Sequence, residues 1–152
     1  MSAGTPESGR WSGGAHHLPV RVYYEDTDFT GIVYYANYLK FFERGRTDAL
    51  RTAGLSHAEL LKADPPVGFA VRKVTVEYHA PARIDDALIV ETRFASLTGV
   101  RMGIAQSITR DGVLLASAEV EAVCIDLDGR PKRLPAGLKD ALGKMAGGLT
   151  SR

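Results

Sequence analysis

The chain has 152 residues, enough for one domain with a sizeable core, and 45% of them are hydrophobic and 24% charged. This balance is typical of a globular protein and excludes a largely disordered or fibrous chain. The formal net charge of +1 provides no strong overall field for nucleic acid. No apolar run approaches the roughly 20 residues that span a bilayer, and no N-terminal segment resembles a secretion signal, so we expect a cytoplasmic protein.

The N-terminal region lacks apolar periodicity. Residues 1–18 are rich in Gly and Ser and are predicted to form a flexible tail. His16 and His17 are adjacent, but no other metal ligand lies at a useful spacing, so an incidental pair in a tail is the favoured interpretation. Residues 18–24, LPVRVYY, place Val20 and Val22 on one face and predict a short first strand.

Residues 37–53 have apolar and small side chains at spacings of three and four, which predicts a long amphipathic helix. The apolar face comprises Tyr38, Phe42, Gly45, Ala49 and Ala53, and the opposite side Lys40, Glu43, Arg44, Asp48 and Arg51. Gly45 costs roughly 1 kcal/mol relative to Ala inside a helix, so we expect it to permit close approach of a facing backbone. Gly54 follows as a C-terminal cap, and Ser56 opens a capping box that predicts a second helix, with His57 solvated in its first turn.

From residue 67 onward the pattern changes to period two. It predicts four successive strands over residues 69–80, 87–97, 100–110 and 113–127, with turns at Thr98-Gly99 and Asp111-Gly112. Cys124, the single cysteine, alternates in phase with small apolar residues and is predicted to be a buried core residue rather than a reactive thiol.

One strand, a long helix and a four-stranded meander bury their apolar surfaces best as an antiparallel five-stranded sheet with the helix on one face. The predicted fold class is therefore α+β. No interdomain linker is evident, so residues 19–135 are predicted to form a single domain, and residues 136–152 a weak terminal helix and tail.

The stretch YEDTDFTGIVYYANY, residues 24–38, places Glu25, Asp26 and Asp28 just before an apolar aromatic run. A solvated turn is one interpretation, because Asp and Thr bond readily to nearby backbone and Gly31 suits a chain reversal. A cation site is the second, since the spacing partly matches an EF-hand loop, but Asn37 stands where the bidentate Glu belongs. The third is a hydrolytic site, with a carboxylate beside helix-start N–H groups that stabilise an oxyanion.

Three runs carry a closer resemblance: RVYYEDTDFTGIVYYANYLKFFERGRTDALRTAGLS, FAVRKVTVEYHAPARIDDALIVET and AEVEAVCIDLDGRPKRLP. Together they resemble the YbgC-type acyl-CoA thioesterases associated with the Tol-Pal system, relatives of the 4-hydroxybenzoyl-CoA thioesterases. The resemblance covers nearly everything from Val20 to Pro135. It implies a hot-dog fold, in which the sheet wraps around one long helix, and hydrolysis of acyl-CoA or similar thioesters without a metal or a dissociable cofactor.

The same resemblance implies roles for individual residues. Asp28 matches the catalytic second Asp of the DxDxxG motif, acting as nucleophile or as general base towards water, while Glu25 and Asp26 support it. The Tyr35 backbone N–H polarises the thioester carbonyl, and Gly31 permits close substrate approach. The neighbouring residues expected to contact substrate are Val33, Tyr34 and Tyr38.

One position departs from the family pattern. Many YbgC-type sequences carry His where this chain has Tyr35, whereas the 4-hydroxybenzoyl-CoA branch is closer to this one. A backbone N–H survives that exchange, but a side-chain role for His in proton transfer does not. The Tyr35 side chain is equally well interpreted as a packing residue.

Coenzyme A carries phosphates, which call for cations. The candidates are Arg72, Lys73, Arg101, Lys132 and Arg133, each of which is otherwise a solvated surface charge. The resemblance further implies a site formed between the subunits of a homodimer or homotetramer, with acyl-CoA or an acyl-carrier-protein thioester as substrate.

Two alternatives use the same fold. A non-catalytic acyl-thioester-binding or envelope-associated protein stays open because Tyr35 replaces the His common in relatives. A dehydratase is disfavoured, since that chemistry needs a His beside the site, and His79 at a strand end is expected on the surface.

Overall fold

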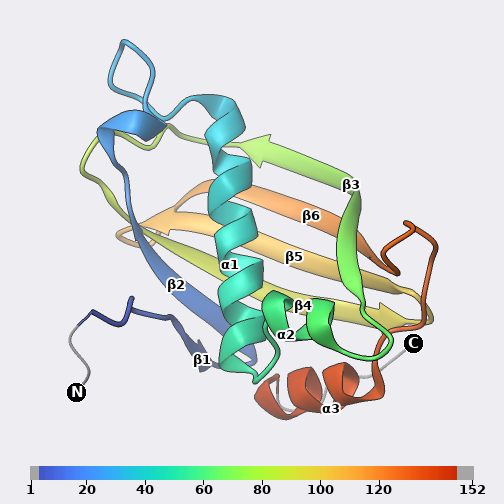
Figure 1. Cartoon of the computed structure of the whole chain (residues 1–152). Helices are drawn as coiled ribbons and strands as arrows, with labels where there is room; N and C mark the ends of the chain where they lie inside the picture. Colours follow the sequence, from blue (N-terminus) through green and yellow to red (C-terminus); the bar gives the residue numbers. More distant parts are fainter. Residues whose placement is uncertain (1–3, 147–152) are drawn as a thin grey trace.

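The computed structural model describes residues 4–146. They form a six-stranded antiparallel sheet that curves around the long helix α1 (Figure 1). The strands are β1 (Arg10–Ser12), β2 (Ala15–Arg21), β3 (Gly68–Tyr78), β4 (Ala87–Thr98), β5 (Arg101–Arg110) and β6 (Val113–Ile125). The helices are α1 (Tyr38–Thr52), α2 (His57–Lys62) and α3 (Ala136–Met145), with 3₁₀ turns at Tyr24–Asp26 and Tyr35–Asn37. The α+β prediction is confirmed, with six strands in place of five.

The sheet order is β1-β2-β4-β5-β6-β3. Strands β4, β5 and β6 form the expected meander, and Asp111 and Gly112 adopt the positive φ angles of 50° and 79° that a tight hairpin turn requires. The predicted meander of four strands is wrong for β3, which pairs with β6 and lies at the edge. Residues 79–86, which connect β3 to β4, bond to the loop before α1, for example from Val33 N to the Ala82 carbonyl at 2.8 Å, instead of making a tight turn.

The prediction of a tail over residues 1–18 is wrong for residues 10–18. Strands β1 and β2 form a hairpin joined by Gly13 and Gly14, at φ 61° and 79°, and β2 pairs with β4. His16 is fully buried in β2. A buried histidine and a proline within one short strand break the apolar alternation by which strands are recognised. Residues 1–3 and 147–152 of the predicted tails lie outside the described residues.

Helix α1 lies tightly against the sheet, as predicted. A Cβ atom on Gly45 would stand 2.7 Å from Val90 Cγ1 and 2.9 Å from Thr92 Oγ1, so the close contact is with side chains of β4 rather than with a backbone. Tyr38, Phe42, Gly45 and Ala49 are buried as expected. Asp48 is also buried, which corrects its predicted place on the polar side of the helix.

The remaining predicted elements are present. Ser56 Oγ accepts the Glu59 N–H at 3.1 Å at the start of α2, while His57 is half-buried, with Nε2 3.1 Å from Thr47 Oγ1, and is not solvated as predicted. Cys124 is buried, and burial raises the pKa of its thiol.

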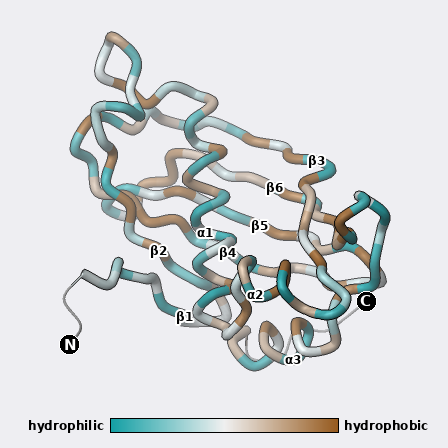
Figure 2. The backbone as a smooth tube through the Cα atoms, viewed as in Figure 1, coloured by the Kyte–Doolittle hydropathy of each residue, from teal (hydrophilic) through white to brown (hydrophobic). Residues whose placement is uncertain are grey.

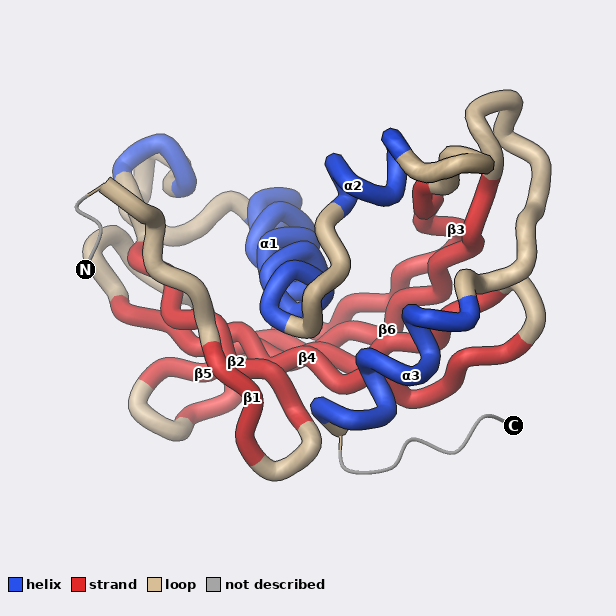
Figure 3. Tube along the Cα trace, turned by 60° about the horizontal axis from the view of Figure 1, so that its bottom comes forward, coloured by secondary structure: helices blue, strands red, loops and turns tan. Residues whose placement is uncertain are grey.

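Hydrophobic and hydrophilic residues alternate along the strands (Figure 2), and the buried residues of β4 include Val90 and Thr92, which lie against Gly45 of α1. Helix α3 runs along the sheet towards the β1–β2 turn (Figure 3), where Ala146 lies against Gly14. Leu138 and Leu142 of α3 are fully buried. Among residues 4–146, no helix is both long and apolar enough to cross a membrane.

Candidate active site

The segment between β2 and α1 projects from one end of the molecule as a narrow hairpin (Figure 1). Thr27 bridges to Val33, and Asp28 N donates to the Ile32 carbonyl at 2.9 Å. Gly31 closes the tip with φ 83°, a conformation that L side chains rarely adopt. Phe29 at the tip is 100% exposed. We call residues 26–35, which contain the candidate catalytic groups, the catalytic loop.

Asp28 bonds within its own turn. Its Oδ1 accepts the Thr30 hydroxyl at 2.6 Å and the Thr30 N–H at 2.7 Å. The hydroxyl bond and then the backbone bond hold the pKa of the Asp28 carboxyl below its usual range. Both hydrogen bonds from Thr30 go to Oδ1, so the other carboxylate oxygen, Oδ2, does not bond to Thr30. Asp28 is therefore an ionised, oriented carboxylate on the surface of this chain.

Asp26 is buried and organises the loop. Its Oδ2 accepts the Tyr23 N–H at 2.8 Å, and its backbone carbonyl accepts Tyr34 N–H at 3.1 Å and Asn37 Nδ2 at 2.8 Å. The two aspartates of the motif thus bond to different parts of the loop. Among residues 4–146, no group of three or more His, Cys, Asp or Glu side chains is placed to hold a metal ion.

Tyr35 opens the 3₁₀ turn that leads into α1, so its N–H has no acceptor within that turn. Nor does this N–H donate a hydrogen bond elsewhere in the described chain. Both flanking carbonyls are bonded: Tyr34 O accepts the Asn37 N–H at 2.8 Å, and Tyr35 O accepts the Tyr78 hydroxyl at 2.8 Å. The Tyr35 side chain is 62% exposed, so the structure does not make it a buried packing residue.

An open aromatic pocket of about 300 Å³ adjoins Tyr35. Its lining is Val33, Tyr35, Tyr38, Tyr78, His79, Ala80 and Pro81. Three of the predicted site residues meet here, and Tyr34 lies outside the lining. Sequence reasoning missed Tyr78, and it placed His79 away from the site; His79 is exposed, as expected, yet lines this pocket.

The candidate phosphate-binding cations lie elsewhere on this chain. Arg72 and Arg101 both pair with Glu121, at 2.6 and 3.1 Å. Arg72 stands six residues before Tyr78, about 20 Å along an extended strand. Lys73 lines a separate hollow with Glu119 and Glu121, and Arg133 is exposed beyond β6. One chain alone does not bring these cations to Asp28, so their role stays a prediction.

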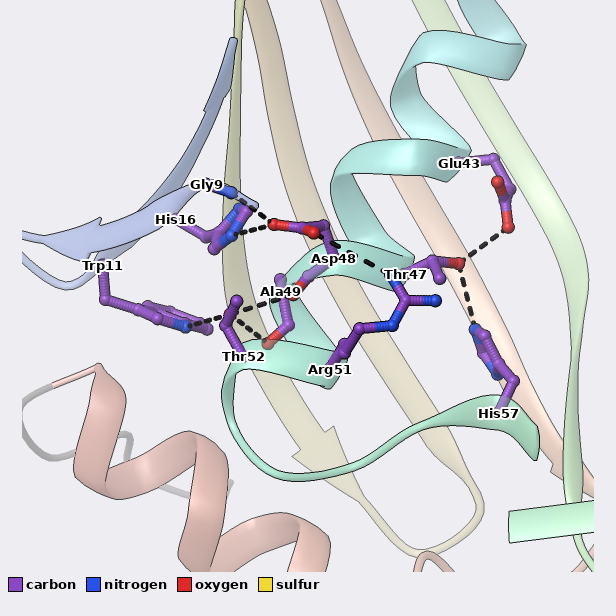
Figure 4. Close-up of polar contacts among 10 residues, drawn as sticks. All are labelled: Gly9, Trp11, His16, Glu43, Thr47, Asp48, Ala49, Arg51, Thr52 and His57. Carbon is purple, nitrogen blue, oxygen red and sulfur yellow. Dashed lines mark hydrogen bonds and ion pairs between the residues drawn. The ribbon is translucent and has the colours of Figure 1, made fainter. Parts of the chain in front are cut away.

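A second polar cluster lies at the other end of α1 (Figure 4). Asp48 Oδ2 accepts the Gly9 N–H at 2.7 Å and lies 2.9 Å from His16 Nε2. Thr52 Oγ1 accepts the Trp11 indole N–H at 3.1 Å. Burial lowers the pKa of His16, and the nearby Asp48 only partly opposes this. Asp48 follows Gly45 by three residues and precedes Thr52 by four, a spacing that places all three on one face of the helix. This spacing was the one available signal for the burial of Asp48.

Comparisons with known proteins identify the family of this chain. Residues 22–142 match the thioesterase-like superfamily. The acyl-CoA thioester hydrolase YbgC of Escherichia coli is 47% identical over 122 residues, which cover 79% of this chain and 90% of that protein. This chain belongs to the YbgC-type thioesterases. It is therefore a thioester hydrolase with the hot-dog fold, as the sequence resemblance implied.

Two further relatives agree with this assignment. The acyl-CoA thioesterase YbgC of Haemophilus influenzae is 40% identical, covering 82% of this chain and 91% of that protein. A crystal structure of a probable thioesterase from Bartonella henselae is also 40% identical, with a TM-score of 0.78, and the match covers 80% of this chain and 99% of that one. The family match begins only at residue 22, so it does not include β1 or β2.

Proposed function

We propose that this thioesterase hydrolyses acyl-CoA thioesters, with Asp28 as the catalytic carboxylate and the Tyr35 N–H as the oxyanion donor. One observation carries the proposal: an ionised carboxylate and an unbonded helix-start amide belong to one hydrogen-bonded loop. The names of the relatives from Escherichia coli and Haemophilus influenzae support acyl-CoA as the substrate class. The resemblance assigns the same two groups.

The thioester carbonyl would gain negative charge on attack, and the Tyr35 N–H would stabilise it. In one route Asp28 attacks the carbonyl carbon, the C–S bond breaks, and the thiolate takes a proton from solvent. Water then hydrolyses the resulting mixed anhydride and regenerates the carboxylate. In the other route Asp28 takes a proton from water, which attacks directly. A lowered pKa keeps Asp28 ionised, which both routes require.

Thiol release from a panel of short-chain, long-chain and aroyl-CoA substrates tests the activity. Asp28→Asn is expected to lower kcat at least 100-fold, or about 2.7 kcal/mol in activation free energy. Asp111→Asn, in the β5–β6 turn, is the matched control and should remain active. Full activity in Asp28→Asn would refute the assigned carboxylate. After a single turnover in ¹⁸O-water, ¹⁸O in the Asp28 side chain would establish the anhydride route, because water attack on the thioester labels only the released acid.

Binding of acyl-CoA without turnover across the panel would instead support the non-catalytic alternative. The same assay with acyl-carrier-protein thioesters tests that second predicted substrate. The cytoplasmic location is a further proposal, to be tested by cell fractionation.

We also propose a homodimer or homotetramer. Strand β3 pairs with β6 on one side only, and most of its residues are exposed, including Val71 and Val74. An edge of this length invites a second strand, which a second copy would supply. Light scattering after size-exclusion chromatography measures the mass directly. A monomer at micromolar concentration would contradict the assembly without touching the assignment of Asp28.

A further inference from the structure

Tyr78 connects the far edge of the sheet to the catalytic loop. It is the last residue of β3, 43 positions along the chain from Tyr35, and its hydroxyl donates to the Tyr35 carbonyl at 2.8 Å. Its ring makes edge-on contacts with the rings of Tyr35 and Tyr38, at centroid distances of 6.4 and 5.1 Å. Two kinds of contact, ring packing and one hydrogen bond, therefore join this strand end to the start of α1.

Three hydrogen bonds hold the peptides around the Tyr35 amide. Tyr34 N–H donates to Asp26 O at 3.1 Å, and Tyr34 O accepts the Asn37 N–H at 2.8 Å. The next carbonyl, that of Tyr35, is held by the Tyr78 hydroxyl. Of these three bonds, only the last comes from a side chain on another element. Without the Tyr78 bond, the exposed Tyr35 residue loses the hydrogen bond from outside the loop that restrains its ψ angle.

We infer that Tyr78 is a positioning residue of the thioesterase, whose hydroxyl fixes the Tyr35 peptide so that the neighbouring N–H faces the thioester carbonyl. This inference rests on the proposed function. A phenol has one proton to donate. Because that proton is bonded to the Tyr35 carbonyl, Tyr78 acts through Tyr35 and not on the reacting atoms.

Burial, followed by the neighbouring Tyr38 and Tyr35, raises the pKa of Tyr78, so the hydroxyl keeps its proton above the usual titration range of a phenol.

Tyr78→Phe removes the hydroxyl and keeps the ring contacts. Loss of an oxyanion donor lowers kcat by two to three orders of magnitude, so a misaligned donor is expected to lower it about tenfold. KM for the best acyl-CoA should change less than twofold, as should the inhibition constant of a CoA thioether, which lacks the carbonyl. Tyr24→Phe, at a tyrosine that is 82% exposed, is the matched control and should match the wild type.

A kcat for Tyr78→Phe equal to that of the wild type would overturn the inference, as would a rise in KM with kcat unchanged. A readout without turnover separates this result from failure of the proposed function. The ¹H–¹⁵N cross-peak of Ala36, whose peptide contains the Tyr35 carbonyl, should shift in Tyr78→Phe and not in Tyr24→Phe. An inactive wild type would refute the proposed function, and an unmoved Ala36 cross-peak would refute the inference, whichever substrates are cleaved.

Discussion

The two ends of α1 differ in how their polar groups are used. At the N-terminal end, the Tyr35 amide has no acceptor in the described chain, and Tyr35 is 62% exposed. At the C-terminal end, Asp48 is 6% exposed and accepts a hydrogen bond from Gly9, at the start of the β1–β2 hairpin. In the described chain, one helix thus has an unbonded backbone amide at one end and hydrogen-bonded, buried polar groups at the other. The difference separates activity from stability: changes at the catalytic loop should lower turnover, and changes around Asp48 should lower the free energy of unfolding.

The largest stability effect is expected from Asp48→Ala. This variant leaves the Gly9 N–H and the fully buried His16 without their carboxylate. An unsatisfied buried polar group costs about 1–3 kcal/mol, so the two together are expected to cost about 3 kcal/mol. Urea unfolding measures the loss, with Asp140→Ala on the exposed side of α3 as the control. Below the unfolding transition, kcat should stay near the wild-type value. A tenfold fall in kcat there would contradict the separation of the two ends.

Gly45→Ala tests the contact midway between the ends. The added methyl group would stand 2.7 Å from Val90 Cγ1, and overpacking of this kind destabilises by about 2 kcal/mol despite the better helix propensity of Ala. Gly143→Ala in α3 is the matched control, because an added Cβ there meets nothing within 4 Å. Equal stability of the two variants in urea would show that α1 can move off the sheet at little cost.

The burial of His16 predicts a smaller effect, a dependence of the free energy of unfolding on pH. Burial lowers its pKa in the folded state, so below the ordinary value of about 6.5 the unfolded chain binds a proton that the folded chain refuses. The stability contribution is complete above pH 6.5 and is lost as the pH falls towards the folded-state pKa. Urea unfolding at a series of pH values should show this decline, His16→Phe should reduce it, and His79→Gln should leave it intact. An unchanged slope in His16→Phe would contradict the assignment.

The smallest effect concerns the catalytic loop alone. Thr30→Val removes the hydroxyl that contributes most to the lowered pKa of Asp28, so the acid limb of the kcat/KM profile should move to higher pH. Thr30→Ser retains a hydroxyl and should restore the wild-type limb. Neither variant should alter unfolding in urea, because the bond is exposed.

The two ends also differ in how far the sequence predicts them. The Asp28 motif, Gly31 and the start of α1 lie within a few residues of one another, so local spacing and family resemblance identify them. The Asp48 cluster joins α1 to residues of β1 and β2 that lie more than 30 positions earlier in the chain. Its only local signal is one charged residue on the buried face of α1. Tyr78 was missed for the same reason, since its partner Tyr35 is 43 residues away.

The prediction of strands likewise succeeds where the signals are local and fails where the partners are far apart in the sequence. Strands β4, β5 and β6 combine clear alternation with glycine turns, and both signals are local. The pairing of β3 with β6 depends instead on the connection at residues 79–86, whose backbone bonds to the loop before α1. No spacing within β3 itself reveals that choice. The sequence therefore predicts strands β3 to β6 well, and their neighbours only where a tight turn joins them.

The β1–β2 hairpin has a practical consequence for defining the folding unit. The match to the family model begins at residue 22, and a fragment cut there would lack the strand that pairs with β4 from His16 to Arg21. It would expose the backbone edge of β4 and the face of α1 that Gly9 and Trp11 cover. Shortened versions of this enzyme should retain residues from Gly9 onward, because the contacts of the β1–β2 hairpin with β4 and α1 begin there.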